Sequence, residues 1–136
     1  MKVELTDELF WLAATLLMTT FLWVPYILNR MKEQGIWNAM YDPHGETEAS
    51  APWAERMMRA HQNAIENLVV FAPLVLMLYA LEISTEATAL ACSIYFFARA
   101  AHFIVFTLGL PILRVVTFLT GFSCQLFLAL KVLNVV

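Results

Sequence analysis

Charged residues are scarce in this sequence, and their scarcity excludes most soluble folds. Asp, Glu, Lys and Arg make up 14% of the 136 residues, whereas hydrophobic residues make up 61%. Soluble domains contain about 25% charged and 45–50% apolar residues, so this composition indicates a protein of the lipid bilayer. The net charge of −3 provides no basic surface, and we expect no nucleic acid partner.

The motifs of common metal and nucleophile sites are also missing. No CxxC, HExxH, GxSxG or glycine-rich phosphate loop occurs in the chain. The two cysteines, Cys92 and Cys124, lie in apolar runs, and we interpret them as small buried hydrophobic residues. The sequence therefore predicts neither a metal site nor a cysteine nucleophile.

Four apolar segments are present, and each has about the 20 residues that a helix needs to cross a bilayer. They run about 9–28, 60–81, 87–108 and 112–133, and a polar loop of about 29–51 follows the first. We predict an all-α integral membrane protein, a single domain over 1–136 that forms a bundle of four transmembrane helices. The leader carries Glu4, Asp7 and Glu8, unlike a secretory signal, so we interpret the first segment as a retained span.

Prolines modify two of these helices. Pro25 is expected to bend the last turn of the first span, and Pro73 to kink the second. The second helix is expected to start near Pro52 and run to Leu81. At 1.5 Å per residue it would be about 45 Å long, so its first turns should project beyond the membrane.

The basic residues predict the orientation in the membrane. Most of them flank the polar loop or the turn between the last two spans, namely Arg30, Lys32, Arg56, Arg59 and Arg114. Only Lys2 and Lys131 lie at the opposite side. The excess of positive charge favours a cytoplasmic loop and external termini, in the cell (inner) membrane if the source is bacterial.

Polar residues recur on single faces of the later helices. The second helix has a stripe within an arc of about 100°, and the third and fourth have one polar and aromatic face each. The stripe on the second helix consists of Arg56, Arg59, Asn63, Glu66 and Asn67. The faces on the third and fourth helices consist of Tyr95, Arg99, His102 and Phe106, and of Arg114, Phe118, Gly121 and Gln125.

The embedded charges are expected to meet in one layer near the cytoplasm, and they are mainly positive. Arg30, Arg59, Arg99 and Arg114 accompany a single carboxylate, Glu66. Such an excess of cations requires an anion or water, so a small anionic ligand is the natural complement. The alternative is structural: Glu66 and Arg99 form a buried packing pair, while Arg30 and Arg59 extend to lipid headgroups.

The stretch Arg59-Ala60-His61-Gln62-Asn63-Ala64-Ile65-Glu66-Asn67, followed by Phe71, resembles the second-helix signature of the MAPEG family. These are the membrane-associated proteins in eicosanoid and glutathione metabolism. The four helices, the long first loop and the turn from Gly109 to Arg114 also resemble this family, so the similarity covers nearly the whole chain.

The resemblance implies a homotrimer with glutathione as cosubstrate, held between neighbouring subunits near the cytosolic face. By position, Arg30, Arg59, Asn63, Glu66 and His102 match residues that contact glutathione in the family, and we add Arg99 as a candidate contact. Arg114 matches the arginine that stabilises the glutathione thiolate, which makes it the candidate catalytic residue. The substrates would be lipophilic electrophiles or lipid hydroperoxides that arrive from the membrane lipids.

One departure from the family keeps other functions open. The eicosanoid enzymes carry tyrosines where this chain has Phe106 and Phe118, and a phenyl ring cannot donate a hydrogen bond. A catalytically silent binding or scaffold protein with the same fold is therefore an alternative to a glutathione transferase or peroxidase. A small multidrug-type transporter is a further alternative, in which Glu66 would be the membrane carboxylate.

Overall fold

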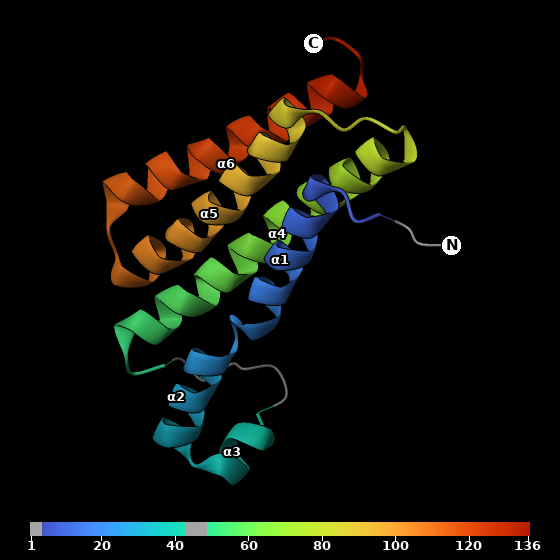
Figure 1. Cartoon of the computed structure of the whole chain (residues 1–136). Helices are drawn as coiled ribbons and strands as arrows, with labels where there is room; N and C mark the ends of the chain where they lie inside the picture. The colour runs from blue at the N-terminus through green and yellow to red at the C-terminus, as the bar shows by residue number, and fades with distance from the viewer. Residues whose placement is uncertain (1–3, 43–48) are drawn as a thin grey trace.

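The computed structural model describes residues 4–42 and 49–136, which form six helices (Figure 1). Lys2 and the middle of the predicted polar loop lie outside this part. The helices are α1 (Asp7–Phe21), α2 (Val24–Gln34), α3 (Ile36–Met40), α4 (Pro52–Ala80), α5 (Glu86–Leu108) and α6 (Pro111–Val132). No strand occurs in the described ranges.

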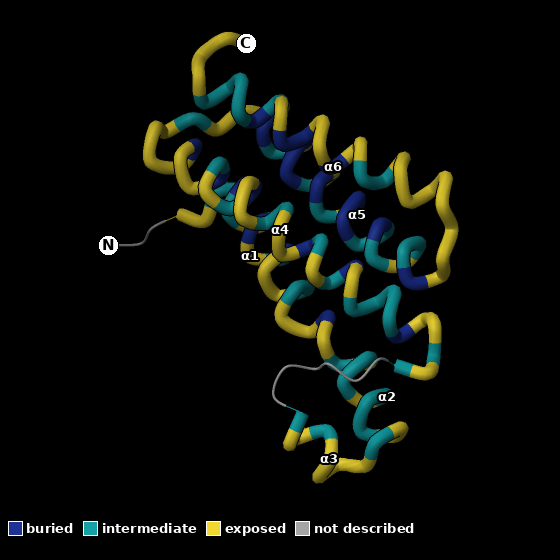
Figure 2. The backbone as a smooth tube through the Cα atoms, turned by 180° about the vertical axis from the view of Figure 1, so that it is seen from behind, coloured by how far each residue is buried: buried dark blue, intermediate teal, exposed yellow. Residues whose placement is uncertain are grey.

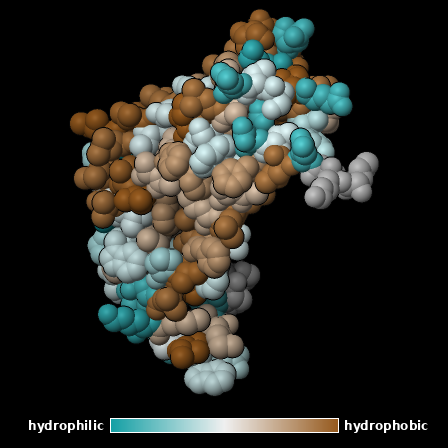
Figure 3. All heavy atoms as spheres, viewed as in Figure 1, coloured by the Kyte–Doolittle hydropathy of each residue, from teal (hydrophilic) through white to brown (hydrophobic). Residues whose placement is uncertain are grey.

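Four helical segments are long and apolar enough to cross a membrane, which confirms the predicted four-helix membrane fold. They are Asp7–Gln34, which combines α1 and α2, and the single helices α4, α5 and α6. On the face drawn in Figure 3, hydrophobic side chains cover most of the molecule and hydrophilic ones gather towards its two ends. This distribution fits a bilayer around the middle of the bundle.

The first span is interrupted at Leu22 and Trp23, immediately before Pro25. Proline lacks a backbone N–H and cannot donate to the carbonyl four residues earlier, so the helix restarts with Pro25 in its first turn. The new helix continues past Leu28 to Gln34, and α3 follows after Gly35. The polar stretch that we expected as a loop is therefore partly helical. By contrast, α4 continues through Pro73.

The bundle is built around α5, which packs against α1, α4 and α6. Viewed from behind in Figure 2, buried positions are concentrated along α5. Phe71 of α4 stacks on Tyr95 of α5 with ring centroids 3.8 Å apart, in a core with Val75, Leu78 and Leu128. In Figure 1, α2 and α3 extend from the bundle on the side away from α5 and α6.

Two sequence signals fix the ends of α5. Thr85 and Thr88 form a capping box at its start, in which each side chain bonds the other residue's backbone N–H. Gly109 ends the helix at φ +74°, a conformation that favours glycine, and Pro111 then opens α6. A side-chain carbon on Gly109 would meet the Arg56 guanidinium at 3.2 Å.

A carboxylate ties the opposite end of the bundle together. Glu8, in the first turn of α1, is only 2% exposed and accepts a hydrogen bond of 2.5 Å from the Thr88 hydroxyl. The Ser84 hydroxyl donates to both Glu8 carboxylate oxygens at 3.0 and 3.1 Å. In the sequence Glu8 is one of three acidic residues of the leader, and nothing there indicates its partners, which lie 76 and 80 residues away.

The Thr88→Val substitution should lower the free energy of unfolding by about 1–3 kcal/mol, because it removes the shortest hydrogen bond to the buried Glu8 carboxylate and also the side-chain acceptor of the Thr85 N–H. Thermal unfolding in detergent measures the change. Ser93→Ala on the same helix is the control, since the Ser93 hydroxyl bonds only a carbonyl of its own helix. Equal effects of the two substitutions would show that Glu8 does not depend on Thr88.

Candidate functional site

A chain of hydrogen bonds joins α4, α5 and α6 in the polar layer. Arg99 Nη2 donates to Asn63 Oδ1 at 2.5 Å. Asn67 Nδ2 donates to both the carbonyl and the side-chain oxygen of Asn63 at 2.9 and 3.2 Å. Gln125 Nε2 of α6 donates to the Asn67 carbonyl at 2.9 Å. Three helices are thus tied through two asparagines that lie one turn apart on α4.

Gly121 of α6 lies against Arg99 of α5. It is buried, and a side-chain carbon built there would lie 3.4 Å from Arg99 Cδ and 3.8 Å from the Tyr95 ring. That is ordinary van der Waals contact, so an alanine at this position would fit without displacing Arg99. The residue follows Phe118 and precedes Gln125 on the predicted polar and aromatic face of α6.

Arg99 is the most unusual group of this layer. It is 3% exposed, and its Nε and Nη1 atoms have no hydrogen-bond partner in the part of the chain that the structure describes. His102, one turn further along α5, is 2% exposed, and its Nδ1 is also without a partner. The ion pair with Glu66 that we considered is absent, since Glu66 lies exposed on α4.

A cavity of about 220 Å³ lies beside this layer, between α4, α5 and α6. Its lining comprises Asn63, His102, Phe106, Arg114, Val115, Phe118 and Leu119. The Arg114 guanidinium carbon lies 5.1 Å from the centre of the Phe106 ring, a cation–π contact. The His102 ring centroid is 5.6 Å from Phe106 and 6.0 Å from Phe118. The lining thus combines polar and cationic side chains with aromatic and aliphatic ones that contact them.

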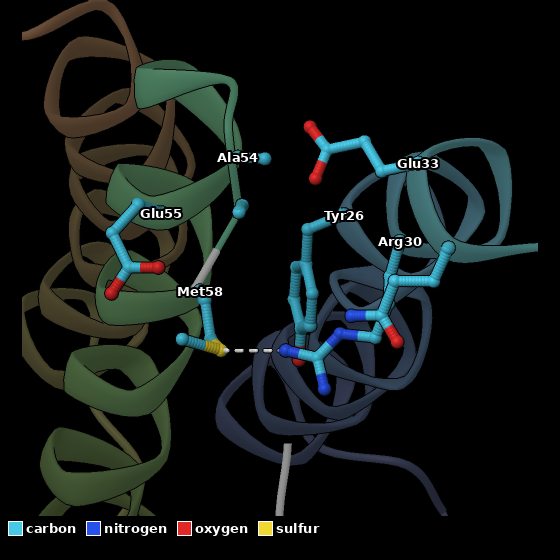
Figure 4. Close-up of a pocket in the computed structure, with 8 residues that line it drawn as sticks. Tyr26, Arg30, Glu33, Ala54, Glu55 and Met58 are labelled. Atoms are coloured by element: carbon cyan, nitrogen blue, oxygen red, sulfur yellow. Dashed lines mark hydrogen bonds between the residues drawn. The ribbon is translucent and has the colours of Figure 1, made fainter. Parts of the chain in front are cut away.

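The other predicted site residues do not line this cavity. Arg30 lies between α2 and α4, where it pairs with Asp42 at 3.6 Å and points at the Met58 sulfur, 4.0 Å away (Figure 4). Arg59 is exposed and pairs with Glu55 at 3.8 Å. Within one chain the structure therefore brings Asn63, His102 and Arg114 to the cavity, with Arg99 bonded to Asn63. Arg30 lies apart from it between α2 and α4, and Arg59 and Glu66 are exposed on α4.

Two further polar contacts were not anticipated from the sequence. The Tyr26 hydroxyl and His61 Nδ1 are 2.7 Å apart and connect α2 to α4. Arg56 Nε donates to the Thr107 carbonyl at 2.8 Å and connects α4 to the end of α5. At about 100° per residue His61 lies off the polar stripe of α4, which is the available sign in the sequence that it faces another element.

Comparison with protein families then decides the affiliation. The model of the MAPEG family matches residues 9–134, which is nearly the entire chain. The chain belongs to the MAPEG family. This confirms the resemblance found in the second-helix signature. No curated protein matches the chain.

Membership of the MAPEG family gives the cavity a context. The family name couples membrane association to eicosanoid and glutathione metabolism, so a glutathione-related function is supported at that level. Both cysteines, Cys92 and Cys124, are free and buried in this MAPEG chain. Neither of them lines the cavity.

The Arg99→Met substitution should leave the protein at least as stable in detergent as the original. A buried cation with two unpartnered nitrogens has lost its hydration, and replacing buried charges by apolar side chains of similar size is often neutral or stabilising. Phe71→Ala in the core, expected to cost about 3–5 kcal/mol, is the contrasting variant. A loss of stability for Arg99→Met that approaches that value would contradict our interpretation of Arg99.

Proposed function

We propose that this MAPEG protein is a membrane-embedded glutathione-dependent transferase or peroxidase that acts on lipophilic electrophiles or lipid hydroperoxides. The observation that carries the proposal is the position of Arg114 on a cavity lined by both polar and apolar side chains. The polar side chains suit glutathione, and the apolar ones suit a substrate that enters from lipid.

Arg114 would supply the electrostatic part of catalysis. A cation beside a thiol lowers the pKa of that thiol, and the thiolate is the nucleophile. In the transferase reaction the thiolate sulfur attacks an electrophilic carbon, and a thioether forms while the leaving group departs with its bonding electrons. In the peroxidase reaction the thiolate sulfur attacks the terminal peroxide oxygen, the O–O bond breaks, and the lipid alkoxide leaves and takes up a proton to become an alcohol. A second glutathione then displaces water from the resulting sulfenic acid and forms the disulfide.

Asn63, His102 and Arg99 would bind and position the peptide portion of glutathione. Asn63 and His102 line the cavity, whereas Arg99 is shielded behind Asn63. Because the Asn63 oxygen accepts from both Arg99 and Asn67, its amide N–H₂ group is left to face a ligand. Arg99 would therefore act by orienting Asn63 and by its positive potential.

A homotrimer would complete the site. Arg59 and Glu66 lie on the exposed face of α4, and Glu66 makes no hydrogen bond or ion pair with the described residues. An isolated carboxylate facing lipid is costly, which supports a subunit interface there. Across it, Arg30 and Arg59 would meet the carboxylates of glutathione, and Glu66 would meet its ammonium group.

The orientation follows the distribution of positive charge. We propose that the termini face outward and the segment between α2 and α4 faces the cytoplasm, because Arg30, Lys32, Arg56, Arg59 and Arg114 lie at that end. Glutathione would then reach the cavity from the cytoplasm, and the lipophilic substrate would reach it from the surrounding membrane lipids.

The Arg114→Ala substitution should reduce the ultraviolet absorbance of bound thiolate and lower conjugation of a model electrophile about 10- to 100-fold, which corresponds to one or two pKa units of the thiol. Titration of purified protein with glutathione measures both. Lys131→Ala at the other end of α6 is the matched control. Lys131 is also a cation over a phenylalanine ring, that of Phe127, but it does not line the cavity. Unchanged conjugation by Arg114→Ala would refute the mechanism.

A catalytically silent binding or scaffold protein is the second candidate, and the two phenylalanines favour it. Phe106 and Phe118 both line the cavity, where they provide no hydrogen-bond donor for a thiolate. In that case the protein would bind glutathione, or another anion, without turnover of electrophiles or hydroperoxides.

The Phe106→Tyr and Phe118→Tyr substitutions distinguish these two candidates. A hydrogen bond to a charged group contributes about 1.5 kcal/mol, so an added phenol near the thiolate should raise turnover by about tenfold in a working enzyme. Conjugation and peroxide reduction are measured beside Phe106→Leu, which changes the ring without adding a donor. Binding of glutathione with no turnover in any variant would establish the silent protein.

A further inference from the structure

An apolar surface on α3 stands outside the bundle and outside the proposed site. It consists of Ile36, Trp37, Met40 and Tyr41, which are 60%, 71%, 64% and 81% exposed. At about 100° per residue these four side chains fall within an arc of about 140°, so they form one face of the helix. Asn38 lies outside this arc, and the described residues leave the α3 face uncovered.

The position of α3 along the chain places this face at the boundary of the membrane. The first span, Asp7–Gln34, has 28 residues. Its last turns contain Asn29, Arg30, Lys32 and Glu33, polar groups that belong among the lipid headgroups and not in the hydrocarbon core. α3 begins only two residues after Gln34.

The exposed face of α2 also indicates that the boundary of the membrane lies near the end of this helix. Pro25, Leu28 and Lys32 are exposed and recur at spacings of three and four, so they lie on one side of the helix. Leu28 is apolar, and Lys32, in the last turn, is the cation at which the apolar stripe ends. A lysine in this position extends its ammonium group to the headgroups, so Lys32 marks the level of the interface.

Gly35 redirects the chain at that level. It has φ +84° and ψ 153°, a conformation that an L side chain rarely adopts, and it separates α2 from α3. The chain therefore does not continue along the axis of α2 into the solvent. In Figure 1, α3 lies beside the end of α2 and away from α5 and α6.

We propose that α3 is an interfacial anchor whose α3 face inserts between the headgroups and the first acyl carbons of the cytoplasmic leaflet. The partner is the lipid bilayer. Tryptophan and tyrosine have apolar rings with a polar group, which suits the zone between hydrocarbon and water, and isoleucine and methionine add apolar area.

The anchor would fix the segment that follows α2. Asp42, one residue after Tyr41, pairs with Arg30, and Glu33 accepts hydrogen bonds from the Ser50 and Ala51 backbone N–H groups at 3.0 and 3.1 Å. Lipid contact on the α3 face would hold α3 against the membrane, while these two contacts hold both ends of the connecting segment to α2.

The proposal is tested with spin labels in nanodiscs of phosphatidylcholine and phosphatidylglycerol. Cys92 and Cys124 are first replaced by alanine, and labels are then attached at Met40→Cys on the α3 face and at Asn38→Cys outside it. The accessibility of each label is measured with two relaxing agents, oxygen, which concentrates in lipid, and a water-soluble nickel chelate. The ratio of oxygen to nickel accessibility should be several-fold higher at position 40 than at position 38.

Two outcomes would overturn the anchor. Equal ratios with strong nickel accessibility at both positions would place α3 in water. A label at position 40 that neither agent reaches would show that protein covers the face, as a second copy of the chain would. Ile36→Cys repeats the measurement on the same face, so a folding defect at position 40 cannot obscure the result.

Discussion

The hydrogen bond between Arg99 and Asn63 is the interaction on which the polar layer depends. A guanidinium in the centre of an apolar bundle has lost its water, and only one of its three nitrogens has a partner in the described chain. Such a group is costly for stability. It is kept in place because Asn63 is in turn fixed by Asn67, and Asn67 by Gln125 from the next helix.

This arrangement makes the layer positive and rigid at the same time. Arg99 is held away from the cavity by the residue that lines it, so its charge contributes a potential without occupying the space. Arg114 is held differently, by the face of the Phe106 ring, and is free to meet a negative atom in the cavity. One arginine is structural support and the other is the proposed reactive contact, although both are arginines on polar faces of neighbouring helices.

The four membrane spans could be predicted from the sequence, because the length and composition of an apolar segment decide whether it can cross a bilayer. It also indicated the polar faces of α4, α5 and α6, since side chains four residues apart lie together on a helix. It could not place Arg30 or Arg59 relative to the cavity, because the joint at Leu22 and Trp23 and the exposed side of α4 are tertiary features. Glu8 and His61 were missed for a similar reason: each bonds to a residue far away in sequence.

The interruption of the helix at Leu22 and Trp23, before Pro25, allows α1 and α2 to change independently of each other. α1 packs against α4 and α5, whereas α2 contacts α4 and α3. Because no continuous helical ladder connects them, a rotation or an added residue in α2 is not transmitted to the register of α1 in the core. The first span thus consists of two independent helices. α1 is part of the bundle core and α2 is not, so an insertion in α2 would leave the core packing of α1 intact.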